Sequence, residues 1–134
     1  MSFPAVELKV HETTTKDGLA PVFLRFEDGV LAITSDDGAF PLPEGALAAV
    51  MERYGAPLET TEKLVHVGAL DLGGGRTLRQ VRHLARYDVI ARDFLVYEAS
   101  GHDPICALAT TVAGVLGHLG RAARAALDVA ASDG

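Results

Sequence analysis

The chain has 134 residues and a formal net charge of −6, with 49% hydrophobic and 22% charged residues. This composition is typical of a soluble globular protein and excludes general disorder, a collagen-like repeat and a disulfide-based scaffold. Because domains commonly have about 100–200 residues, we predict a single domain over residues 1–134.

Charge is unevenly distributed along the chain. Residues 1–60 hold four Lys and Arg against ten carboxylates, whereas residues 76–98 hold five Arg against three carboxylates. The acidic overall balance argues against a surface built to coat nucleic acid or anionic lipid. Cys106 is the only cysteine, and the N-terminus lacks the basic and apolar pattern of a secretory signal. We therefore expect no disulfide and a cytoplasmic location.

The first predicted strand covers residues 5–11. Apolar and polar side chains alternate there, so Leu8 and Val10 should lie on one face and Lys9 and His11 on the other.

Two further strands, 21–27 and 30–35, are joined by Asp28-Gly29, which favours a type I′ hairpin turn. If Glu27 pairs with Val30, the register is fixed. The apolar side chains that then share one face are Val22, Leu24, Phe26, Leu31 and Ile33.

A short helix is predicted over residues 44–54, because apolar side chains recur there at helical spacing between Pro43 and Gly55. Residues 64–72 then form a strand that ends at three glycines.

Residues 77–87 fit either a returning strand or a helix. We prefer the helix, because Leu78, Val81, Leu84 and Ala85 fall on one arc at 100° per residue. Thr77 followed by Gln80 also matches a capping box.

Residues 89–98 are predicted as a strand, and residues 105–130 as a long helix with a sustained apolar stripe. Residues 104–120 carry no Asp, Glu, Lys or Arg, but Pro104, His118 and three glycines favour a buried helix over a membrane span. No membrane association is therefore expected.

These elements predict an α+β fold. We expect an antiparallel sheet of about five strands, with a short central helix and a long C-terminal helix packed on one face.

The C-terminal helix should exceed the width of a small domain, at about 1.5 Å per residue. Part of it is therefore expected to project and pair with a second copy. The predicted interface comprises a small-residue side and two larger apolar residues: Ala109, Ala113, Gly117, Leu119 and Leu127.

A candidate anion site lies where glycines precede the predicted helix at residue 77, because amide groups at a helix N-terminus attract negative charge. Arginines continue along that helix. The candidate residues are Gly74, Gly75, Arg76, Thr77, Arg79, Arg82 and Arg86.

Our leading hypothesis is a non-catalytic binding or regulatory module that self-associates as a homodimer through its C-terminal helix. One alternative is a nucleic-acid-associated protein that uses the basic face from Arg76 to Arg86, although the few aromatic residues disfavour it. Another is a small enzyme or binding domain for an anionic metabolite at Gly73–Thr77. An acidic protein is a further possible partner.

No catalytic residues are predicted. The five histidines lack the spacing of a zinc motif, and no nucleophile elbow or phosphate-binding loop occurs. We expect no metal and no cofactor, and the sequence favours binding over catalysis without deciding between them.

Overall fold

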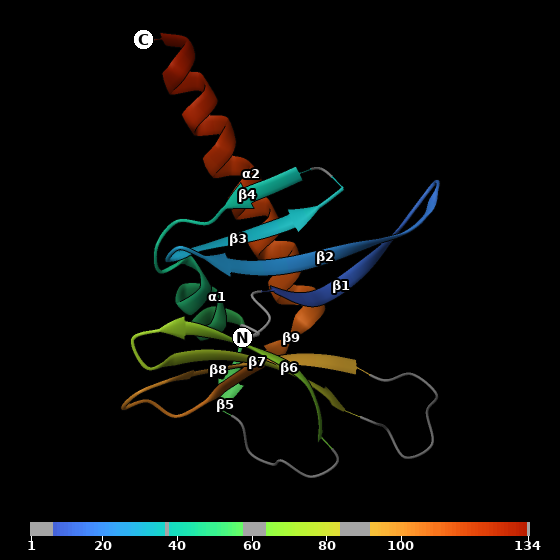
Figure 1. The fold of residues 1–134 in the computed structure, drawn as a ribbon, viewed down its shortest axis with the longest axis vertical. Helices are drawn as coiled ribbons and strands as arrows, with labels where there is room; N and C mark the ends of the chain where they lie inside the picture. The colour runs from blue at the N-terminus through green and yellow to red at the C-terminus, as the bar shows by residue number, and fades with distance from the viewer. Residues whose placement is uncertain (1–6, 37, 58–63, 84–91, 134) are drawn as a thin grey trace, which may run out of the picture.

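The protein is described by a computed structural model that covers residues 7–36, 38–57, 64–83 and 92–133. These residues form an α+β fold, as predicted, with antiparallel strands, one short helix and one long C-terminal helix. The strands divide between two sheets, where one sheet was expected (Figure 1).

The first sheet is a meander of four strands. It consists of β1 (Glu7–Thr15), β2 (Gly18–Glu27), β3 (Val30–Ser35) and β4 (Gly38–Pro41), each paired with the next. The β2–β3 hairpin confirms the predicted register, with Glu27 opposite Val30. Asp28 and Gly29 both have positive φ, at 54° and 79°, as a type I′ turn requires.

The second sheet has the strand order β5-β9-β8-β7-β6. Its strands in chain order are β5 (Ala56–Pro57), β6 (Leu64–Gly73), β7 (Arg76–His83), β8 (Arg92–Ala99) and β9 (Ile105–Leu108).

The helix predicted at residues 77–87 is wrong: β7 occupies residues 76–83, and residues 84–87 lie outside the described part of the chain. β7 lies between β6 and β8, and Leu78 and Val81 are buried on its opposite faces. A strand that buries both faces shows no alternation, which is why the pattern resembled a helix. Gln80 lies in the strand and caps no helix.

The two helices are α1 (Ala46–Tyr54) and α2 (Ala109–Asp133). α2 begins later than predicted, because residues 105–108 pair with β8 as the strand β9. β4 was not predicted.

One buried apolar cluster draws side chains from both sheets and both helices. The sheets approach closely where β1 crosses β6, since a Cβ added at Gly68 would lie 2.8 Å from Leu8 Cδ2. α2 packs on the inner face of the first sheet: an added Cβ at Gly120 would lie 2.7 Å from Phe40 Cβ and 3.2 Å from Ile33 Cγ2. The glycine permits this close approach.

The small-residue side of α2 is therefore used within the chain. Ala109 and Ala113 are buried in the core, and Gly117 is buried where an added Cβ would lie 3.7 Å from Ile33 Cδ1. Leu119 also packs against this core. Ala109, Ala113 and Gly117 therefore make contacts within the chain itself, and Leu119 is half-buried against the same core. Leu127 is different, with 67% of its surface exposed.

The C-terminal part of α2 extends beyond the edge of the first sheet, as Figure 1 shows. Residues 121–129 are exposed apart from the half-buried Ala123. No helix among the described residues is long and apolar enough to cross a membrane.

Candidate functional site

The predicted anion site at Gly74–Thr77 does not lie at a helix N-terminus. Gly73, Gly74 and Gly75 all have positive φ and form the turn between β6 and β7. Arg76 donates hydrogen bonds from its guanidinium to the carbonyl oxygens of Leu72 and Gly73, at 3.2 and 3.3 Å. The glycines therefore make a tight hairpin turn, and Arg76 helps to close it.

The predicted arginine face is divided between the two faces of the second sheet. Arg76 and Arg82 lie on the face that also carries Gln80, whereas Thr77 and Arg79 lie on the other face. Arg79 forms an ion pair with Glu98 of β8. Arg86 lies outside the described residues. A continuous basic face from Arg76 to Arg86 is therefore not formed by the described arginines.

Charged side chains from both sheets line an open cleft of about 570 Å³. β1 forms one wall, the ends of β7 and β8 form another, and the start of α2 completes it. The polar and charged lining residues are Lys9, His11, Glu12, Arg82, Arg92, Asp93 and Thr110.

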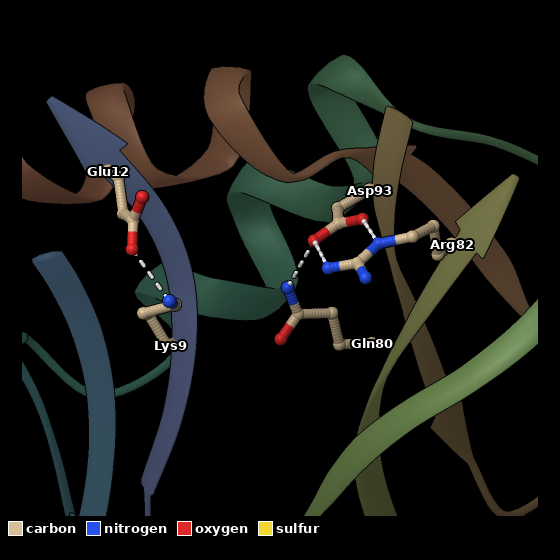
Figure 2. A network of polar contacts seen from close by, with 5 residues as sticks. All are labelled: Lys9, Glu12, Gln80, Arg82 and Asp93. Atoms are coloured by element: carbon tan, nitrogen blue, oxygen red, sulfur yellow. Dashed lines mark hydrogen bonds and ion pairs between the residues drawn. The ribbon is translucent and has the colours of Figure 1, made fainter. Parts of the chain in front are cut away.

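Asp93 is the centre of the network on the second sheet (Figure 2). Arg82 donates to both of its carboxylate oxygens, from Nε at 2.8 Å and from Nη2 at 3.3 Å. Gln80 Nε2 donates to Asp93 Oδ2 at 2.9 Å. The hydrogen bond and the negative charge of Asp93 raise the pKa of Arg82, so this guanidinium stays charged.

Gln80 joins this network from a buried position in β7. It is 2% exposed, and its Oε1 has no hydrogen-bond partner within the described part of the chain. The carboxylate can only accept from the amide NH₂, so the orientation of the amide is fixed by Asp93.

Lys9 and Glu12 form the opposing pair on β1, with Nζ 2.6 Å from Oε1 (Figure 2). Each carboxylate of the cleft therefore already has a cationic partner. Arg92 has no ion-pair or hydrogen-bond partner in the described ranges.

His11 reaches the cleft because β1 contains a bulge. The register shifts between Lys9 and His11, so that His11 lies opposite Val22, whose side chain belongs to the core. Bulges commonly re-aim a side chain in this way. Regular alternation predicts that His11 lies on the polar face, and the sequence carries no signal for the bulge.

A second, smaller hollow of about 160 Å³ adjoins the cleft, since His11 and Thr110 line both. It runs between α2 and the inner face of the first sheet. Its other lining residues are mainly apolar or small: Val22, Ile33, Ser35, Phe40, Ala113, Gly114, Gly117 and Arg121.

Cys106 lies in β9 beside an apolar hollow lined by Tyr54, Pro57 and Phe94. It is half-buried, and burial raises the pKa of its thiol. The thiolate, which is the reactive form, is therefore disfavoured.

The described residues contain no group of three or more His, Cys, Asp or Glu that could hold a metal ion. No protein-family model matches the chain, and no curated protein or solved structure is significantly similar to it.

Proposed function

We propose that this chain is a non-catalytic binding module that self-associates through the C-terminal part of α2, residues 121–133. The observation that carries the proposal is the exposure of two large apolar side chains on this projecting segment, 67% for Leu127 and 62% for Val129. Each would gain about 1.5–3 kcal/mol from full burial.

The apolar stripe of α2 supports a second copy of the chain as the partner. Leu119 packs against the core, Ala123 is half-buried and Leu127 is exposed, at successive spacings of four residues. One helical face therefore continues from the chain's own core into solvent. A second copy offers the same stripe for burial.

The charges on this segment are compatible with a twofold pair. Arg124 and Asp128 lie one helical turn apart and form an ion pair at 3.6 Å. In an antiparallel pair centred near Ala126, Arg124 of one copy would lie beside Asp128 of the other. Such a twofold interface is self-complementary, and closed dimers are the commonest symmetric assemblies.

Sedimentation equilibrium of Leu127→Lys tests the proposal. This variant should shift the chain towards the monomer, because it places a charge on the apolar stripe. Leu19→Lys is the matched control, since Leu19 is 68% exposed on β2, outside the proposed interface. Wild-type mass in Leu127→Lys, with circular dichroism unchanged, would refute the proposal.

A further inference from the structure

We draw no further inference here: the strongest candidate, the apolar hollow of about 560 Å³ beside Cys106 in the second sheet, is lined by Pro57 and Leu64, between which the chain lies outside the described residues, so nothing in the structure shows what covers it.

Discussion

His11 lies opposite Val22 in the β1–β2 register, although regular alternation along β1 would turn it to the polar face. Val10 occupies the bulge and is itself buried, with 2% of its surface exposed. The consecutive side chains of Val10 and His11 therefore both point towards the core, instead of to opposite faces of the sheet. This arrangement brings an imidazole to the junction of the cleft and the smaller hollow.

The β2–β3 turn depends on Gly29, whose φ is 79°. Gly29→Val should lower the free energy of unfolding by about 1 kcal/mol or more, because a β-branched residue resists positive φ. Gly29→Asn should lower the free energy of unfolding by less, since asparagine tolerates this conformation. Urea denaturation of both variants measures the difference, and equal stability of Gly29→Val and the wild type would contradict the turn assignment.

The Gln80–Asp93 contact predicts that Gln80→Glu lowers the free energy of unfolding in a pH-dependent way. A second carboxylate would lie beside Asp93 in a buried position, which should cost about 1–3 kcal/mol near neutral pH. Burial and the like charge raise the pKa of the introduced carboxyl above its unfolded value, so the penalty appears as pH rises and disappears below about pH 4.

Gln80→Met provides the control for that experiment, because it has similar volume and no charge. Its stability relative to the wild type should not depend on pH in the same range. Thermal unfolding monitored at several pH values compares the variants. A constant deficit for Gln80→Glu at every pH would mean that lost packing, and not charge, is the cause.

The packing of α2 on the first sheet predicts opposite effects at two of its glycines. Gly120→Val should destabilise by about 1–3 kcal/mol, because its Cβ would lie 2.7 Å from Phe40 Cβ. Gly114→Ala should be neutral or stabilising, since its Cβ meets nothing within 4 Å and alanine favours a helix. Chemical denaturation measures both, and similar stabilities would contradict the close approach at Gly120.

Cys106 should react slowly with iodoacetamide in the folded protein. Burial raises its thiol pKa, so the thiolate fraction near neutral pH is smaller than in the unfolded chain. For the same reason its contribution to stability is present below the unfolded thiol pKa and is lost as pH rises through the folded value. Cys106→Ala should remove that alkaline loss, and equal alkylation rates in buffer and in denaturant would contradict the account.

Local sequence chemistry was sufficient for several elements. Asp28-Gly29 specified the hairpin and its register, and helical spacing between Pro43 and Gly55 located α1 to within two residues. The excess length of the C-terminal helix also correctly indicated that it projects past the first sheet (Figure 1).

The strand β7 and the cleft could not be predicted from the sequence, because both depend on packing between distant segments of the chain. β7 is buried on both faces, so its strand period was hidden. Its arginines were accordingly assigned to one face, although Arg79 and Arg82 lie on opposite faces. The cleft combines residues from β1, β7, β8 and α2, and only pairing across the fold places Lys9 near Arg82 and Asp93.

Static light scattering of the unmodified chain at micromolar concentration tests the proposed self-association most directly. We expect a mass about twice the chain mass of 14.1 kDa, because a closed pair buries the exposed stripe at Leu127. A mass equal to that of one chain across the whole concentration range would contradict the proposal and would mean that the projecting part of α2 remains exposed without a second copy.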